Sequence, residues 1–329
     1  MRSTCSLYID AGYLLAAAAT RVTGTSLRSG IYVDYATLIS SLVDTAEARS
    51  GLPVLRLHWY DSARNGVPDA RQERIGELSK VKLRLGRFGV NGDQKGVDLR
   101  LGLGLGLVAH ARNRASEVFF LVSGDDLTEA VEEAQVHGVQ VVLLAVPTVD
   151  GKPHGVSRHL IRAADELDSI DGATVDAAVM KVDRQPALEP ITPEPTPEPA
   201  QPAVAAARPV VRTPLDLVSI PQSPAGPRST SVLAYSVSTG SPGRVLPGYD
   251  EDDEQDQLID EVVLRVLASF QESATSDDRL ELQRARPSIP RDIDRALLLD
   301  ASDVMEKYDL DEGIRYRSRA RFWAKYDQP

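Results

Sequence analysis

The stretch of sequence that decides the fold is Val118-Phe119-Phe120-Leu121-Val122-Ser123-Gly124-Asp125-Asp126. It begins with an unbroken apolar run, which is typical of a β-strand that is covered on both faces. The run stops at a small Ser-Gly pair, and two acidic residues follow at once. The pattern predicts a buried strand of a parallel sheet with carboxylates at its carboxyl end, where ligands gather in open α/β sheets.

Apolar runs of the same kind lie on both sides of this stretch, at residues 7–9, 54–59 and 139–146. Between them, apolar residues recur at helical spacing in residues 35–48, 127–137 and 157–167. Strands that alternate with helices favour a sheet with helices on both faces and right-handed crossovers. We therefore predict an α/β fold with a three-layer domain and a mostly parallel sheet.

Residues 99–112 carry a conflicting signal. Leucine occupies every second position, and Gly102, Gly104 and Gly106 stand between the leucines. A period of two favours a strand, and each glycine inside a helix costs about 1 kcal/mol relative to alanine. The stretch nevertheless ends in good helix-forming residues, and the alternation requires a helix before the strand at residue 118. We predict a helix here.

Proline divides the chain, because most of its 21 prolines lie between residues 186 and 247. We predict an α/β domain over residues 1–182, a disordered Pro-rich linker over 183–250, and an acidic run with a small helical module over 251–329. In the module, apolar stripes predict helices around residues 259–270, 293–297 and 314–326. Because so short a module is marginal alone, we expect it to dock on the first domain, on a second copy of the chain or on a partner protein.

Composition excludes several classes of protein. The chain has 329 residues and a net charge of -11, and Cys5 is its sole cysteine, so a disulfide framework is excluded. No apolar run reaches the roughly 18 residues of a membrane span, and the start does not resemble a signal peptide, so we expect a soluble, cytoplasmic protein without membrane contacts. The acidic balance argues against a nucleic-acid-binding surface over the whole molecule but not against a local basic groove.

Acidic residues fall where the predicted sheet has its active edge. Asp10 ends the first predicted strand, Asp98 opens the glycine-rich helix, and Asp125 with Asp126 follows the strand at 118. Each of them also has an interpretation as a helix cap or a first-turn residue. Carboxylates that meet at one edge repel, and a hard divalent cation relieves that repulsion, with substrate phosphate completing its coordination. Together the residues predict metal-assisted hydrolysis of a phosphodiester.

These residues also carry a family resemblance. The motifs are Tyr8-Ile9-Asp10-Ala11-Gly12-Tyr13-Leu14, Lys95-Gly96-Val97-Asp98, and Leu121-Val122-Ser123-Gly124-Asp125-Asp126. In this order they resemble the NYN domain, the LabA-like branch of the PIN-like nucleases. The resemblance implies a PIN-like Rossmannoid fold and the activity of an Mg²⁺- or Mn²⁺-dependent ribonuclease that processes or degrades RNA. It also implies that Asp10, Asp98 and Asp125 bind the metal and that Ser123 lies beside it.

The sequence departs from the family pattern at three places. Tyr13 stands where many members have an asparagine, Gly104 or Gly106 where a later helix has an aspartate, and Leu127 where a second acid follows Ser-Gly-Asp. Fewer carboxylates should bind metal more weakly. The alternative function is therefore a catalytically weakened RNA-binding or scaffold protein with a degenerate nuclease site.

Basic residues near the predicted edge could hold RNA. Lysines and arginines between residues 64 and 95, among them Arg87, outnumber the acids there and could neutralise phosphates, although a solvated helix face explains them equally well. Lys95 is the strongest candidate because it lies three residues before Asp98. The tail 315–326 interleaves arginines with aromatic residues. We favour packing of Phe322 and Trp323 in the module over stacking on bases.

Overall fold

The computed structural model describes residues 3–64, 66–88, 99–182, 249–307 and 310–328. Lys95, Asp98 and most of the predicted linker lie outside these residues, and the side chain of Arg87 is also not described. None of the described helices is both long enough and apolar enough to cross a bilayer.

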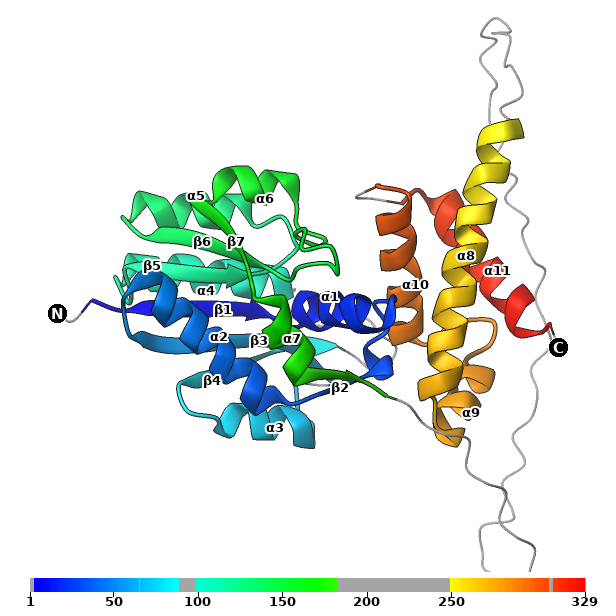
Figure 1. Cartoon of the computed structure of the whole chain (residues 1–329), viewed down its shortest axis with the longest axis horizontal. Coiled ribbons are helices and arrows are strands. Elements are labelled where there is room, and N and C mark those ends of the chain that lie inside the picture. Colours follow the sequence, from blue (N-terminus) through cyan, green and yellow to red (C-terminus); the bar gives the residue numbers. More distant parts are fainter. Residues whose placement is uncertain (1–2, 65, 89–98, 183–248, 308–309, 329) are drawn as a thin grey trace, which may run out of the picture. The chain divides into compact units, whose positions relative to one another are not determined.

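A parallel sheet of six strands, in the order β4-β3-β1-β5-β6-β7, forms the centre of the first domain (Figure 1). The strands are β1 (Cys5–Asp10), β3 (Val54–Arg64), β4 (Val81–Phe88), β5 (Val118–Val122), β6 (Gln140–Ala145) and β7 (Glu166–Ser169). A separate antiparallel pair joins β2 (Ile31–Val33) to β8 (Val179–Lys181). The predicted α/β fold with a mostly parallel sheet is confirmed.

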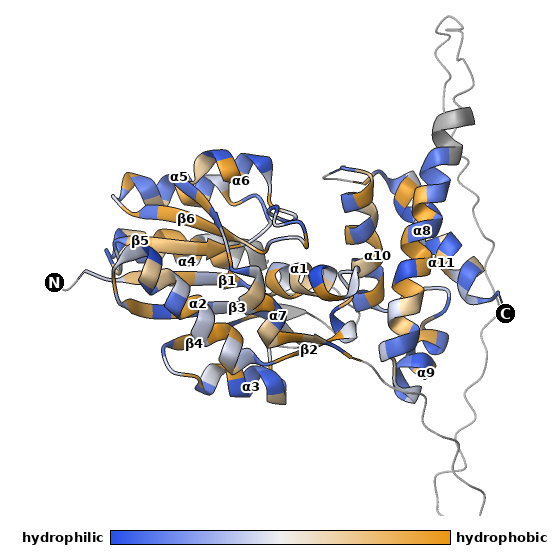
Figure 2. Ribbon diagram, in the orientation of Figure 1, coloured by the Kyte–Doolittle hydropathy of each residue, from blue (hydrophilic) through white to orange (hydrophobic). Residues whose placement is uncertain are grey.

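Helices cover both faces of the sheet. One face carries α1 (Ala11–Thr23), α2 (Tyr35–Ser50), α3 (Ala70–Glu77) and α7 (Gly172–Ala178), and the other carries α4 (Leu99–Arg112), α5 (Thr128–Val136) and α6 (Arg158–Ala163). Side chains of a strand alternate between faces, so Leu7 and Ile9 enter one core and Tyr8 enters the other. Figure 2 shows the apolar central strands between these helices.

The glycine-rich stretch forms the helix α4, as predicted. Leu103 and Leu107, four residues apart, are buried on its inner side, while Leu105 is 56% exposed. A Cβ atom at Gly106 would lie 2.1 Å from the phenol oxygen of Tyr60, and one at Gly104 would lie 3.3 Å from the Cβ of Ala130. The glycines therefore allow α4 to approach the sheet and α5 closely, and this approach explains a composition that is poor for a helix.

The structure differs from the prediction over residues 157–167. The helix α6 ends at Ala163, and β7 begins at Glu166 and pairs with β6. Two acidic side chains of this short edge strand, Glu166 and Asp168, lie 3.7 and 3.2 Å from Arg49 of α2. Polar side chains are common on edge strands. Because β7 contains no run of apolar residues, the apolar pattern of the sequence did not predict it. The strands β2, β4 and β8 and the helices α7 and α9 (Ser276–Ala285) were also not predicted.

The predicted C-terminal helical module is confirmed. It consists of α8 (Tyr249–Ser273), α9, α10 (Arg291–Val304) and α11 (Glu312–Tyr326), which share one apolar core. Phe322 is fully buried in this core, and the indole N–H of Trp323 donates to the carbonyl of Pro287 at 2.9 Å. The aromatic residues of the tail therefore pack inside the module.

The arginines of the same tail face carboxylates. Arg321 pairs with Asp256 at 2.6 Å and with Asp260 at 2.7 Å, both on α8. Arg319 pairs with Asp294 of α10 at 2.7 Å. These contacts agree with the interpretation of the tail as a part of the module's packing, with its cations turned to the acidic stretch.

The module docks on the first domain through the segment between α1 and β2. Leu27 is fully buried and belongs to the apolar core of the module. The backbone N–H of Ser26 donates to Oδ1 of Asp300 on α10 at 3.0 Å. Lys181 of β8 pairs with Glu272 of α8 at 2.7 Å. Of the docking partners considered from the sequence, the structure shows the first domain of the same chain.

We expect the stability of this contact to depend on pH through Asp300. Burial raises the pKa of Asp300 from 3.8 to about 6, and the other charges facing it are Arg265 and Asp303. Because the folded state binds the proton more tightly than the unfolded chain, the contribution of this group to the free energy of unfolding falls as pH rises through that range. Asp300→Asn keeps an acceptor for Ser26 and should remove this dependence.

Urea unfolding of the wild type and Asp300→Asn at about pH 5 and about pH 7 measures the effect. The variant should gain stability relative to the wild type at the higher pH. Asp300→Ala leaves the Ser26 N–H without its acceptor and should cost about 1–3 kcal/mol. If the free energies of unfolding of Asp300→Asn and the wild type differ by the same amount at both pH values, the expectation is contradicted.

Candidate active site

Asp10 occupies the junction between β1 and α1. It is 7% exposed, and its Oδ1 accepts hydrogen bonds from the backbone N–H groups of Gly12 at 2.8 Å and Tyr13 at 3.2 Å. It is therefore the N-cap of α1, as its helix-capping interpretation predicts. No described residue donates a hydrogen bond to Oδ2, so this oxygen is available to a ligand.

The acidic pair after β5 reaches the same edge of the sheet. Ile9 of β1 lies opposite Val122 of β5, so the residues that follow the two strands are neighbours. Ser123 is buried, and its Oγ accepts from the N–H of Asp125 at 3.2 Å, while the side chain of Asp125 is exposed. Asp126 turns toward the start of α5, where its Oδ1 accepts from the hydroxyl of Thr128 at 2.6 Å.

The two acids interact electrostatically. Burial, and then the negative charge of Asp125, raise the pKa of Asp10 to about 6, against the positive charge of Arg295 and the two N–H donors, which lower it. An ionised Asp10 is therefore costly beside Asp125 unless positive charge is added. Carboxylate oxygens are the ligands that Mg²⁺ and Mn²⁺ prefer, so this pair fits a hard divalent cation.

The structure brings together two of the three predicted metal ligands. Within the described part of the chain, no group of three His, Cys, Asp or Glu side chains is placed to hold a metal ion. Asp98 lies outside the described residues, directly before Leu99, the first residue of α4. A complete ligand set therefore needs Asp98 beside Asp10 and Asp125, and this role of Asp98 stays a prediction.

The departures from the family pattern have structural consequences. Gly106 faces Tyr60 and Gly104 faces α5, so neither position could carry an aspartate without moving its neighbours. The hydroxyl of Tyr13 donates to the carbonyl of His154 at 2.7 Å and accepts from the N–H of Val146 at 3.3 Å. Tyr13 thereby ties α1 to the loop that follows β6.

Arg295 is a residue of the site that sequence reasoning missed. Its Nη2 lies 2.8 Å from the point that a Cβ atom on Gly12 would occupy, and Oδ1 of Asp10 lies 2.9 Å from the same point. Arg295 belongs to α10, whose apolar residues Ile293 and Leu297 enter the module core. The periodicity of α10 identified its inner face but gave no signal about what its polar face would meet.

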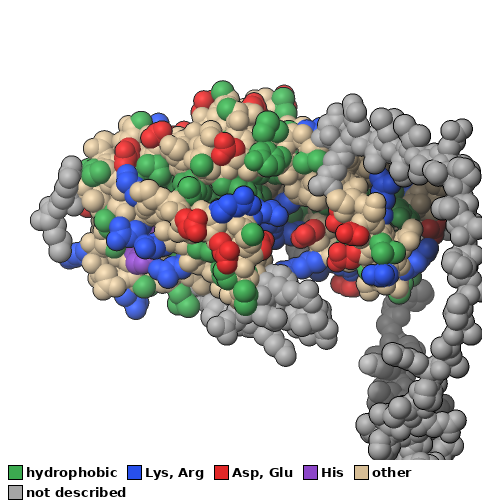
Figure 3. Space-filling view, turned by 90° about the horizontal axis from the view of Figure 1, so that it is seen from below, with side chains coloured by type: hydrophobic (Ala, Val, Ile, Leu, Met, Phe, Trp, Pro, Cys, Tyr) green, Lys and Arg blue, Asp and Glu red, His purple; other side chains and the backbone are tan. Residues whose placement is uncertain are grey.

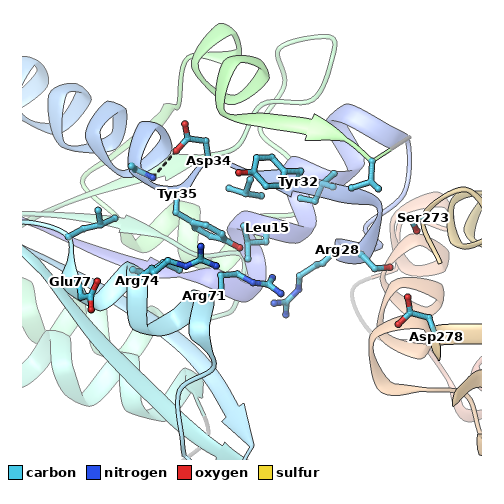
Figure 4. Close-up of a pocket in the computed structure, with 17 residues that line it drawn as sticks. Leu15, Arg28, Tyr32, Asp34, Tyr35, Arg71, Arg74, Glu77, Ser273 and Asp278 are labelled. Atoms are coloured by element: carbon cyan, nitrogen blue, oxygen red, sulfur yellow. Dashed lines mark hydrogen bonds between the residues drawn. The ribbon is translucent and has the colours of Figure 1, made fainter. Parts of the chain in front are cut away.

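A cavity of about 750 Å³ is lined by residues of the first domain and of the C-terminal module. Its lining includes Arg28, Tyr35, Arg71 and Arg74, together with Asp278 of α9. Figure 4 shows the side chains of Arg28, Arg71 and Tyr35 pointing toward one another. Arg71 and Arg74 belong to the group of cations that the sequence placed near the active edge, so part of that group lines a space that can hold a ligand.

Other predicted cations lie on the open side of the edge strand β4. Lys82 and Arg84 are exposed there, and their charges, with that of Arg56 on β3, act on His58. Burial is the main cause that lowers the pKa of His58, to about 3. Figure 3 shows lysines and arginines gathered beside a histidine on this face. The predicted cations are therefore divided between this strand and the cavity.

Comparison with known proteins agrees with this architecture. Residues 5–171 match the NYN domain, so the chain belongs to the NYN domain family, which is part of the PIN-like nuclease superfamily. It is similar to y4oD of Sinorhizobium fredii, a protein described as uncharacterized, with 36% identity over 128 residues. That match covers 38% of this chain and 58% of y4oD, so the chain spans less than two thirds of that relative.

One solved structure is also similar, a protein of unknown function, VPA0982, from Vibrio parahaemolyticus. It is 20% identical, and the match covers 54% of this chain and 97% of that protein with a TM-score of 0.38.

The loop that carries Asp125 should tolerate no side chain at Gly124. A Cβ atom there would lie 2.4 Å from the carbonyl oxygen of Gly155 and 2.7 Å from Cδ2 of Tyr13. Because backbone cannot move aside as a flexible side chain can, Gly124→Ala should lower the free energy of unfolding by about 1–3 kcal/mol. Gly76→Ala is the control, since its Cβ meets Leu83 at an ordinary 3.6 Å. Equal stability of both variants in chemical denaturation would show that the loop is not closely packed.

Proposed function

We propose that this protein is an Mg²⁺- or Mn²⁺-dependent endoribonuclease that hydrolyses phosphodiester bonds of RNA. The observation that carries the proposal is the pair Asp10 and Asp125 at the carboxyl edge of the sheet in an NYN domain. The carboxylate of Asp10 is buried, its pKa is raised, and its Oδ2 accepts no hydrogen bond from a described residue. These properties suit a position that a cation fills.

In this proposal Asp10, Asp98 and Asp125 hold the metal ion. A bound divalent cation polarises the phosphoryl group and lowers the pKa of an attacking water. Asp10 is fixed in place because it also caps α1. Ser123 fixes the backbone of Asp125, and Asp126 supports the site by anchoring the start of α5. Lys95 and Arg87 are proposed to contact substrate phosphate.

A second candidate function is RNA binding without efficient cleavage. It is favoured because no group of three His, Cys, Asp or Glu side chains among the described residues is placed to hold a metal ion. It is also favoured by Gly104 and Gly106, which face α5 and Tyr60 where the family pattern has an aspartate. With fewer carboxylates a site holds its metal less tightly, and phosphate contacts alone can still retain RNA. The two candidates differ in one property, which is metal-dependent cleavage.

The test compares cleavage of end-labelled single-stranded RNA by the wild type and by Asp10→Asn, with Mg²⁺ or Mn²⁺. Asparagine still caps α1 but removes the negative charge, so we expect the fold to persist and the rate to fall on the order of 100-fold or more. Asp44→Asn is the matched control, because Asp44 is exposed on α2.

Asp44→Asn should cleave at the wild-type rate, and EDTA should stop both proteins. Retained binding of the RNA without cleavage by the wild type in either metal would favour the second candidate. Cleavage by Asp10→Asn at the wild-type rate would contradict the proposed site.

A further inference from the structure

The C-terminal module brings a cation to the acidic site from a distant part of the sequence. Nη2 and Nη1 of Arg295 lie 2.8 and 3.3 Å from the position of a Cβ atom on Gly12, with Oδ1 of Asp10 2.9 Å from that position on the same glycine. Any side chain at position 12 would meet both groups. The guanidinium and the carboxylate therefore flank the first turn of α1, where the proposed nuclease site lies.

Arg295 has no ion-pair partner among the described residues. Burial is the main cause that lowers the pKa of Arg295, and the charges of Asp10 and Asp125 oppose that shift. Neither carboxylate lies within ion-pair distance, and part of the Arg295 side chain is exposed. Arg28, whose charge also acts on Arg295, forms no ion pair with a described residue either. In contrast, Arg319 and Arg321 of the same module are paired with carboxylates. Two adjacent arginines without a counter-ion in the described part of the chain can accept an anion.

The charges of the site show which anion fits. A divalent cation would balance the negative charges of Asp10 and Asp125, and Arg28 and Arg295 would then remain without an ion-pair partner among the residues that the structure describes. A phosphodiester carries one negative charge per nucleotide, and guanidinium groups bind its oxygens through charge-assisted hydrogen bonds. A phosphodiester backbone that approaches the carboxylates therefore supplies the missing negative charge.

The docking contacts hold both arginines in place. The hydroxyl of Ser26 donates to the carbonyl of Ala296, the residue after Arg295, at 3.4 Å, and the N–H of Ser26 donates to Asp300 one turn later. Leu27, directly before Arg28, is anchored in the module core. One interface thus positions a cation from α10 and a cation from the first domain together.

The neighbouring cavity extends this arrangement. Arg28 belongs to the lining of the cavity, and its charge acts on Tyr35, which lies beside Arg71 (Figure 4). A run of positive charge therefore leads from Arg295 through Arg28 to Arg71. A phosphodiester backbone bound at Arg295 could continue along these charges, and the ring of Tyr35 beside Arg71 could stack on a base.

We propose that Arg295, together with Arg28, forms a phosphate-binding site for the RNA backbone beside Asp10 and Asp125, so that the C-terminal module completes the nuclease site. The identity of the ligand as RNA rests on the proposed function. The site itself rests on the geometry of the two arginines.

The test measures binding of fluorescein-labelled single-stranded RNA to the full chain in EDTA, over a range of salt concentrations. A plot of log K against log salt has a negative slope, and each lost phosphate contact reduces the magnitude of that slope by about 0.7 for a single strand. Arg295→Gln should therefore lose about 0.7 from the slope and bind RNA about 10-fold more weakly. Arg295→Lys, which keeps the charge, should restore most of the slope.

Arg284→Gln is the matched control, because Arg284 is exposed on α9 of the same module and has no ion-pair partner among the described residues. Its slope and affinity should equal those of the wild type, and the thermal unfolding midpoints of the variants should agree. An unchanged slope in Arg295→Gln, or an equal loss in Arg284→Gln, overturns the proposal.

Cleavage assays with Mn²⁺ separate a phosphate-binding role from a blocking role. If Arg295 binds phosphate, Arg295→Gln should cleave about 10- to 100-fold more slowly than the wild type. Faster cleavage by this variant would show that Arg295 blocks the metal site, and this result would overturn the proposal. If the wild type cleaves no RNA, the proposed function fails, and the salt dependence of binding still decides the role of Arg295.

Discussion

The repulsion between Asp10 and Asp125 is the constraint on which the interpretation of this protein depends. Backbone pairing imposes it, because β1 and β5 are adjacent parallel strands that end at the same edge. Asp10 cannot turn away without releasing the two N–H groups that it caps at the start of α1. The fold therefore holds a buried carboxylate beside another acid, which raises the pKa of Asp10, and added positive charge would favour its ionised form.

The helical module adds a positive charge to that site. Its core includes Leu27 from the first domain, and its helix α10 is hydrogen-bonded through Asp300 to Ser26. Arg295 projects from the same helix toward Asp10. Loss of the module would expose Leu27 and remove one of the positive charges nearest the acids. In the proposed function, the module would contribute to substrate binding through Arg295.

Much of the fold was predictable from the sequence, but the site was predictable only in part. Continuous apolar runs identified the four most buried strands, and the need for alternation identified α4 despite Gly104 and Gly106. The edge strands β4 and β7 carry polar side chains on alternate or exposed positions, so no apolar run marked them. The sequence could place Asp10 and Asp125 at one edge of the sheet because Asp10 ends β1 and Asp125 follows β5. The sequence could not place Arg295 at the site. The amphipathic pattern of a helix indicates which face is buried, but it does not indicate which surface the other face contacts.

The most direct test is anomalous diffraction from crystals of the full chain grown with Mn²⁺, recorded at the manganese absorption edge. The account predicts a peak between the carboxylates of Asp10 and Asp125, within coordination distance of both side chains and close to the start of α4. A peak elsewhere in the molecule, or carboxylates of Asp10 and Asp125 that point in different directions with no density between them, would contradict it.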